Sequence, residues 1–187
     1  MARRELATER LLLRPVEPGD AQALRSLAAD EGAEPHGLLA GARAHPDGPG
    51  GPQPPAAGAV EDWIAEQQAG WEAGTHHTFA VRTRQGALVG VVRLRRSPSA
   101  PRAELGFATL PAARGRGYAT EACRAVLQFA FTDLNLVRIS ALCLGTNQAS
   151  VRVLEKLGFG LEARIERDRP DGGEAVPLLF YGLTRTR

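Results

Sequence analysis

A glycine-rich segment in the second half of the chain combines residue types that suit the binding of an anion. It follows a strand-like stretch, precedes a helical pattern and reads Leu110-Pro111-Ala112-Ala113-Arg114-Gly115-Arg116-Gly117-Tyr118-Ala119-Thr120. Gly115 and Gly117 remove side chains where the backbone must approach a ligand, and the unpaired N–H groups at a helix start favour a pyrophosphate. No Gly-Lys-Ser/Thr follows, and Thr120 replaces the third glycine of the dinucleotide fingerprint. A plain glycine-rich strand–helix turn is the alternative interpretation.

Cysteine and histidine are placed poorly for nucleophilic catalysis or for metal binding. Cys123 and Cys143 lie in apolar runs without a CxxC spacing or a partner histidine, which predicts two core residues and a reducing compartment. His76 and His77 precede a strand and have no third ligand at metal spacing. We therefore expect neither a thiol nucleophile nor a metal.

Composition and charge favour one globular domain over residues 1–187. Of the 187 residues, 43% are hydrophobic and 24% are charged, which is ordinary for a folded domain. A net charge of +2 argues against nucleic acid as the main partner. Only three leucines separate the arginines near the start, too few for an export signal, and no apolar run reaches the roughly 18 residues of a membrane span. The sequence predicts a cytoplasmic protein that binds neither membrane nor nucleic acid.

Hydrophobic periodicity predicts the elements that position the glycine-rich segment. Alternating or continuous apolar stretches indicate strands over 11–13, 78–82, 87–95, 104–110, 137–144, 159–165 and 176–183. Helical spacing indicates helices after Asp20 as N-cap, over 61–71, from 118 onward, and after Asn147 as N-cap. The order βααβββαβαββ, with a hairpin at Gln85-Gly86, predicts a mixed α/β sheet. Pro177 in the last strand is expected at a sheet edge or a bulge.

Residues 32–58 differ in composition from the rest of the chain. They hold 7 Gly, 6 Pro and 6 Ala. Such a segment buries too little apolar surface to offset the entropy lost on ordering. The sequence therefore predicts a mobile surface loop here.

Several motifs recur around the glycine-rich segment. Arg114-x-x-Gly117-x-Ala119 stands with Ala103-Glu104-Leu105-Gly106-Phe107, Ala119-Thr120-Glu121-Ala122, Asn147-x-x-Ser150 and Glu155-Lys156-Leu157-Gly158-Phe159. Jointly they resemble the GNAT superfamily of acetyl-CoA-dependent N-acetyltransferases, whose signature is Arg/Gln-x-x-Gly-x-Gly/Ala. The opening Thr8-Glu9-Arg10-Leu11-x-Leu13-Arg14-Pro15 resembles its ribosomal-protein-alanine acetyltransferase (RimJ/RimL-like) branch. The resemblance covers two stretches, 7–31 and 59–183.

This resemblance implies a fold and a cofactor site. The fold would be an α/β (α+β) GNAT fold, whose mixed, mostly antiparallel central sheet is flanked by helices and splayed where the strand over 104–110 leaves the strand over 137–144. The pantetheine arm of acetyl-CoA would enter the splay, and a main-chain N–H near Phe107 or Ala108 would face the thioester oxygen. The cofactor-binding residues implied are Phe107, Ala108, Leu110, Arg114, Gly115, Arg116, Gly117, Tyr118, Ala119, Thr120 and Asn147.

The resemblance also implies acid–base roles, each with a structural alternative. An amine is mostly protonated at pH 7, so a base must remove a proton, and Glu104 at the mouth of the cofactor strand is the candidate, through a water. A solvated carboxylate at a strand start is the alternative. Ser150 is the candidate donor of a proton to the departing thiolate. The alternative is a structural serine in the first turn of a helix, hydrogen-bonded to the backbone. Asn147 suits both a pantetheine contact and the helix N-cap.

The expected function is transfer of an acetyl group from acetyl-CoA to a primary amine, with a protein N-terminal amine among the acceptors. Two alternatives stay open: a small-molecule acceptor, such as an amino sugar, amino acid or antibiotic amine, or a module that binds acyl-CoA without catalysis. The partners expected are a small-molecule or peptide amine, and a homodimer is left open. The loop over 32–58 is expected to flank the acceptor site as a lid, an insertion without a role being the alternative.

Overall fold

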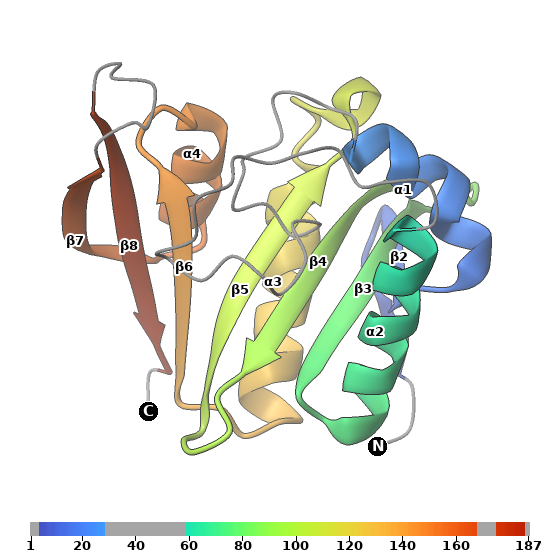
Figure 1. The fold of residues 1–187 in the computed structure, drawn as a ribbon, viewed down its shortest axis with the longest axis horizontal. Helices are drawn as coiled ribbons and strands as arrows, with labels where there is room; N and C mark the ends of the chain where they lie inside the picture. Colours follow the sequence, from blue (N-terminus) through green and yellow to red (C-terminus); the bar gives the residue numbers. More distant parts are fainter. Residues whose placement is uncertain (1–3, 29–58, 168–174, 186–187) are drawn as a thin grey trace.

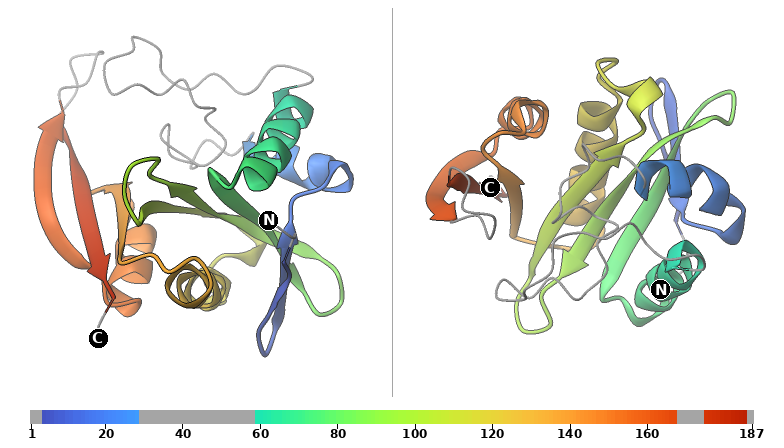
Figure 2. Two further views of the ribbon diagram at one scale, coloured as in Figure 1. Left: turned by 90° about the horizontal axis from the view of Figure 1, so that it is seen from below. Right: turned by 45° about the horizontal axis from the view of Figure 1, so that its top comes forward.

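The computed structural model describes residues 4–28, 59–167 and 175–185, which form one eight-stranded sheet with two helices on each face (Figures 1 and 2). The sheet order is β1-β2-β3-β4-β5-β6-β8-β7, and only the β5–β6 pair is parallel. The strands are β1 (Leu6–Ala7), β2 (Leu11–Pro15), β3 (His76–Thr83), β4 (Leu88–Arg96), β5 (Arg102–Thr109), β6 (Arg138–Leu144), β7 (Gly160–Arg167) and β8 (Val176–Thr184). The helices are α1 (Ala21–Ala28), α2 (Ala59–Ala73), α3 (Tyr118–Thr132) and α4 (Gln148–Lys156). The expected mixed, mostly antiparallel sheet flanked by helices is confirmed.

Two apolar clusters hold the helices against opposite faces of the sheet. α3 and α4 cover one face, and the α3 positions predicted to face the core, among them Ala122, Cys123 and Val126, are at most 1% exposed. α1 and α2 cover the other face, where Leu24 and Ile64 pack with residues of β3 and β4 (Figure 2). Burial of these apolar stripes is the main stabilising contribution to the fold.

The sheet opens between its only parallel neighbours. β5 and β6 pair through Arg102↔Arg138, Ala103↔Ile139 and Glu104↔Ser140, and then diverge (Figure 1). Beyond Glu104, β5 keeps its pairing with β4 as far as Thr109, while β6 stays paired with β8. The expected splay is therefore present, and among the described strands none pairs with the second side of β5 over Leu105–Thr109.

The structure differs from the sequence expectations at strand β1 and at Pro177, and one expected segment lies outside the described residues. Strand β1 was not expected, because its two residues carry no periodicity. Pro177 was expected at an edge or bulge, but β8 lies between β6 and β7. Pro177 is the second residue of β8 and lies beyond the last residue pair between β8 and β6, Leu144↔Leu178, so the strand tolerates it there. Its carbonyl oxygen accepts a hydrogen bond from Gly145 N at 2.7 Å. The loop over 32–58 lies outside the described residues.

Asp20 was expected to be the N-cap of α1, and this expectation is wrong. Asp20 ends a 3₁₀ turn over Pro18–Asp20, and its carboxylate accepts from Glu17 N at 2.9 Å. The same carboxylate is fully buried and pairs with Arg14 at 3.0 and 3.1 Å and with Arg82. The side chain therefore joins the start of α1 to β2 and β3, because two arginines compete for the oxygens that a cap would use.

His77 is a buried polar residue inside the aromatic core. Its ring is 0% exposed, lies edge-on to Trp71 at 4.8 Å and to Phe129 at 5.6 Å, and neither ring nitrogen has a hydrogen-bond partner within the described ranges. Burial, reinforced by the charge of Arg96, lowers the pKa of His77 to about 4. Between about pH 4 and 6.5 the folded protein therefore holds a neutral imidazole where an unfolded chain would protonate it.

This burial predicts acid sensitivity. Below pH 6.5 the unfolded chain binds a proton that the folded state excludes, so stability contributed by neutral His77 is complete above pH 6.5 and is lost as the pH falls toward 4. At about 1.4 kcal/mol per pKa unit the loss amounts to about 3 kcal/mol. Urea unfolding of a His77→Phe variant should lack this part of the pH dependence. His76→Gln, at a half-buried neighbour, is the control and should keep it; equal pH dependence in wild type and His77→Phe would refute the assignment.

No helix among the described residues is both long and apolar enough to cross a bilayer.

Candidate active site

The glycine-rich segment forms a turn whose shape depends on its glycines. After β5 a 3₁₀ turn over Pro111–Ala113 leads to Gly115 at φ 74° and Gly117 at φ 77°, and α3 begins at the next residue. Residues with a Cβ rarely adopt such positive φ angles. Gly117 is the N-cap and offers no side-chain acceptor, so the first-turn N–H groups of Tyr118, Ala119 and Thr120 are left for an anion.

A carboxylate on α3 fixes this turn to the start of the chain. Glu121 accepts from Thr8 Oγ1 at 2.6 Å, from Arg10 N at 3.0 Å and from Arg10 Nε at 2.7 Å. Arg10 also donates to Arg116 O at 3.0 Å and lies over the Tyr118 ring. Partial burial alone would raise the pKa of Glu121, but the hydrogen bonds from Thr8 and Arg10 outweigh it and lower that pKa. The sequence showed Thr8, Arg10 and Glu121 as members of separate motifs. It did not predict their contact, because Glu121 lies more than 100 residues from the other two.

Phe107 and Ala108, which were expected to present a main-chain N–H to the cofactor, direct their N–H groups to opposite sides of β5. Leu110 N donates to Val89 O of β4, and main-chain groups alternate in direction along a regular strand. Ala108 therefore directs its N–H and C=O toward β4, and its carbonyl lies where a Cβ on Gly90 would meet it at 2.3 Å. Phe107 directs its main-chain groups to the opened side. Of the two residues expected to present an N–H, Phe107 is therefore the one that can direct it to the opening, because β4 occupies the side that Ala108 faces.

Other expected cofactor residues lie around the same turn. Leu110 donates its N–H to Val89 O and accepts from Ala113 N, so its main-chain N–H is not available to a ligand. Arg114 is exposed and donates from Nε to Thr109 O at 3.2 Å. Arg116 is exposed as well. Two basic side chains therefore surround the uncapped helix start.

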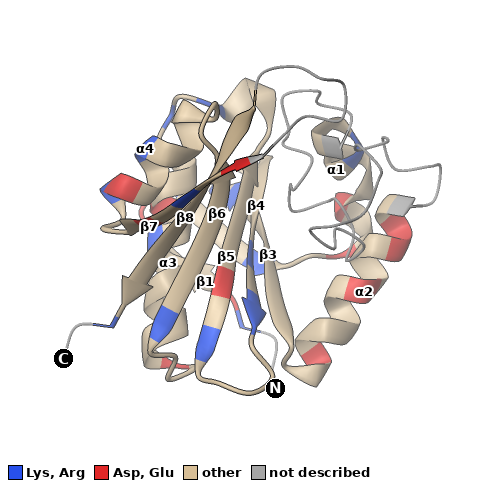
Figure 3. Cartoon of the chain, turned by 60° about the vertical axis from the view of Figure 1, so that its left-hand side comes forward, with Lys and Arg blue, Asp and Glu red and all other residues tan. Residues whose placement is uncertain are grey.

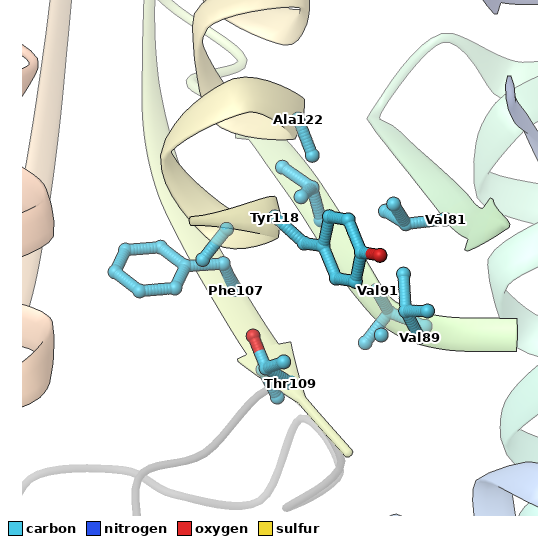
Figure 4. A pocket seen from close by; sticks show the side chains of 11 residues that line it. Val81, Val89, Val91, Phe107, Thr109, Tyr118 and Ala122 are labelled. Carbon is cyan, nitrogen blue, oxygen red and sulfur yellow. The ribbon is translucent and has the colours of Figure 1, made fainter. Parts of the chain in front are cut away.

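A small apolar pocket lies beneath the first turn of α3. Figure 4 shows the Tyr118 ring beside Val81, Val89 and Val91, while the Phe107 ring points the opposite way. Gly90 of β4 also lines this pocket, and sequence reasoning missed it. The signal that could have identified Gly90 is a glycine inside a strand pattern, because such a glycine often marks a position where a ligand or another backbone approaches closely.

The expected acid–base residues lie on opposite faces of the sheet. Glu104 is the last β5 residue paired with β6, and its Oε2 accepts from Arg95 Nη2 at 2.7 Å while its side chain stays 35% exposed. Its strand neighbours Ala103 and Leu105 face α3, so Glu104 faces the side of α1 and α2. Ser150 is half-buried on α4, which covers the other face.

Asn147 is observed as the N-cap of α4. Its Oδ1 accepts from Ser150 N at 3.0 Å, as the capping interpretation predicted. The cap uses only the side-chain oxygen of Asn147, so the N–H₂ group takes no part in it and can donate to a ligand. The structural role of Asn147 is confirmed, and a ligand contact stays a prediction.

The cysteines occupy core positions. Cys123 is 0% exposed and Cys143 is 2% exposed. Burial raises the pKa of the Cys123 thiol, so that it remains protonated and unreactive at neutral pH.

Comparison with known proteins agrees with this geometry. The family model described as "Acetyltransferase (GNAT) domain" matches residues 10–160. "Uncharacterized N-acetyltransferase YnaD" of Bacillus subtilis is 35% identical over 80 residues, 43% of this chain and 47% of that protein. "Putative ribosomal N-acetyltransferase YdaF" of the same organism is 30% identical over 101 residues, 54% of this chain and 55% of that protein. The matched region thus spans about half the length of these relatives.

A solved structure shows the same fold over nearly the whole chain. Spermidine N-acetyltransferase from Vibrio cholerae, in complex with CoA and spermine, superposes with a TM-score of 0.75 at 20% identity, covering 95% of this chain and 96% of that one. The family model covers most of the sequence, including the splayed strand β5, the glycine turn and α3. The chain belongs to the GNAT acetyltransferase domain family.

Proposed function

We propose that the protein transfers an acetyl group from acetyl-CoA to a primary amine by direct attack in a ternary complex. The observation that carries this proposal is the opening of the sheet between β5 and β6, which ends at the uncapped start of α3. An extended pantetheine arm can add to the unpaired side of β5, and the α3 N–H groups suit its pyrophosphate. The family supports acetyl-CoA as the acetyl donor.

The residues around the opening have complementary parts in this reaction. Phe107 N–H faces the opening and would stabilise the negative charge that develops on the thioester oxygen. Glu104, partly exposed beside the last paired residues, would take the amine proton through a water. Ser150 on α4 would return a proton to the departing thiolate. A thiol is already a fair leaving group, so the base is the more consequential of the two.

The acceptor is a small-molecule or peptide amine. A protein N-terminal amine is the first candidate that we propose, supported by the similarity to YdaF, which is described as a putative ribosomal N-acetyltransferase. A small amine is the second candidate, because the spermidine N-acetyltransferase of Vibrio cholerae has the same fold. The reaction itself needs neither a membrane nor nucleic acid, and we place the protein in the cytoplasm. A homodimer is compatible with this proposal, and so is a monomer.

Steady-state release of free thiol from acetyl-CoA, measured across a panel of amines, tests the proposal. Direct attack predicts amine-dependent thiol release and double-reciprocal lines that intersect when both substrates are varied. Parallel lines would indicate a covalent acetyl-enzyme and would contradict direct attack. Both cysteines are buried, so neither is placed to carry the acetyl group. Thiol release that no amine accelerates would reject acetyl transfer.

The glycine turn predicts a loss of cofactor binding. Gly117→Val places a β-branched residue at φ 77°, which costs about 1–3 kcal/mol and displaces the first-turn N–H groups. Calorimetry should then show acetyl-CoA affinity reduced by about 100-fold. Gly86→Val is a matched control, because Gly86 has φ 91° at the β3–β4 hairpin, away from the turn. Similar affinity losses in both variants would mean that strain, and not the turn, is responsible.

A further inference from the structure

Arg93 is a half-buried cation without a direct partner. It lies in β4 between Thr78 of β3 and Gly106 of β5, on the sheet face covered by α1 and α2. Its neighbours are paired: Thr78 donates to Gln67 at 2.8 Å, and Arg95 bonds Glu104. Across residues 4–28, 59–167 and 175–185, the Arg93 guanidinium makes neither a hydrogen bond nor an ion pair.

The surroundings make this charge costly in the absence of an anion. Burial lowers the pKa of Arg93 and repulsion from Arg95 lowers it further, while attraction to the carboxylates of Glu104 and Glu66 opposes this only in part. An arginine nevertheless stays charged at physiological pH. A half-buried guanidinium without a direct hydrogen-bond or ion-pair partner among the described residues keeps its donors for a ligand.

Arg93 and Glu104 share one face of the sheet at a separation that fits a small acceptor. Arg95 is directly opposite Glu104, and Arg93 is two residues further along β4, so the two side chains are diagonal neighbours. Diagonal neighbours on adjacent strands lie about 7–8 Å apart. Figure 3 shows the basic end of β4 beside the acidic segment of β5. An amine at Glu104 and an anionic group at Arg93 can thus belong to one molecule.

We propose that Arg93 binds a carboxylate of the acceptor, so that the acceptors are amines carrying an acidic group. The inference rests on the proposed acetyl transfer and specifies its substrate class. A guanidinium matches a carboxylate with two parallel hydrogen bonds, which fixes the orientation of the amine toward Glu104. The same charge disfavours a polyamine, because a second cation would lie against Arg93 and Arg95.

Matched acceptors isolate the carboxylate. Two pairs of amines differ only in a carboxylate: β-alanine is compared with β-alaninamide, and the dipeptide amide Ala-Glu is compared with Ala-Gln. Spermidine is added as a polyamine. Each amine is tested with wild type, Arg93→Met, Arg93→Lys and Arg124→Met. Arg124 is an exposed arginine of α3, on the opposite face of the sheet, and controls for the loss of a positive charge. Thiol release gives KM and kcat, and calorimetry gives acetyl-CoA affinity for each variant.

We expect wild type and Arg124→Met to prefer the carboxylate member of at least one pair by about 10- to 100-fold in kcat/KM, mainly through KM. Arg93→Met should abolish that preference with acetyl-CoA affinity unchanged, and Arg93→Lys should retain part of it. No preference in wild type, or a preference that survives Arg93→Met, overturns the inference while leaving acetyl transfer intact. Absence of thiol release with every amine, spermidine included, contradicts the proposed function itself.

Discussion

Replacing Glu104 by glutamine is expected to lower kcat/KM by about 10²–10⁴-fold, the range for loss of a positioned base. The amide keeps the size of the side chain and retains an oxygen for the bond to Arg95, so the change removes proton acceptance and the negative charge while keeping the shape of the site. Acetyl-CoA affinity should stay at the wild-type value, because Glu104 faces α1 and α2 and not the glycine turn. Steady-state kinetics over a pH series and calorimetry measure the two quantities.

Glu166→Gln is the matched control for this variant. Glu166 is also an exposed strand glutamate bonded to an arginine, Arg164, but it lies on β7 at the far edge of the sheet. It should leave kcat/KM unchanged. A few-fold loss in Glu104→Gln, with the acidic limb of the pH–rate profile preserved, would show that another group accepts the proton.

Asp20→Asn is expected to destabilise the fold by about 3–5 kcal/mol, the usual cost of removing one partner from a buried ion pair. The carboxylate is 0% exposed and compensates two arginines, Arg14 and Arg82, whose side chains are only 17% and 23% exposed. Without its charge Arg82 would lose the carboxylate that compensates it, Arg14 would keep only the exposed Glu17 at 3.1 Å, and the start of α1 would lose its attachment to β2 and β3. Denaturant unfolding monitored by circular dichroism measures the loss.

The exposed Asp62→Asn of α2 provides the comparison, with an expected change within about 0.5 kcal/mol. A loss below about 1 kcal/mol in Asp20→Asn would mean that water takes over the role of the carboxylate. In that case the ion pairs of Asp20 would contribute as little to the free energy of unfolding as solvent-exposed ion pairs do.

Local pattern was enough to predict most elements of the fold. α3 follows from the spacing of Ala122, Cys123 and Val126, and the cap of α4 follows from Asn147, because both depend on residues within one or two turns. The hairpin at Gly86 likewise depends on a single glycine with positive φ. Asp20 was assigned wrongly because its partners, Arg14 and Arg82, come from two strands, and no local pattern reveals a three-way ion pair.

The candidate site shows the same division. The glycine turn was visible in the sequence, but which β5 residue offers its N–H to the opening depends on the pairing of Leu110 with Val89. The link from Glu121 to Thr8 and Arg10 joins residues that are more than 100 positions apart in the sequence. Arg93 is one of several arginines in β4 and differs from Arg95 only by its neighbours on β3 and β5. Strand register, and not residue type, distinguishes these positions.

Mass spectrometry after incubation with acetyl-CoA carrying an isotopically labelled acetyl group tests the central claim most directly. With a panel of primary amines present, the account predicts the label on an amine nitrogen, an equal amount of free CoA, and no label on the intact protein. Acetyl-CoA that binds while every amine stays unlabelled would make the protein a binding module, and label retained on the protein would contradict direct attack.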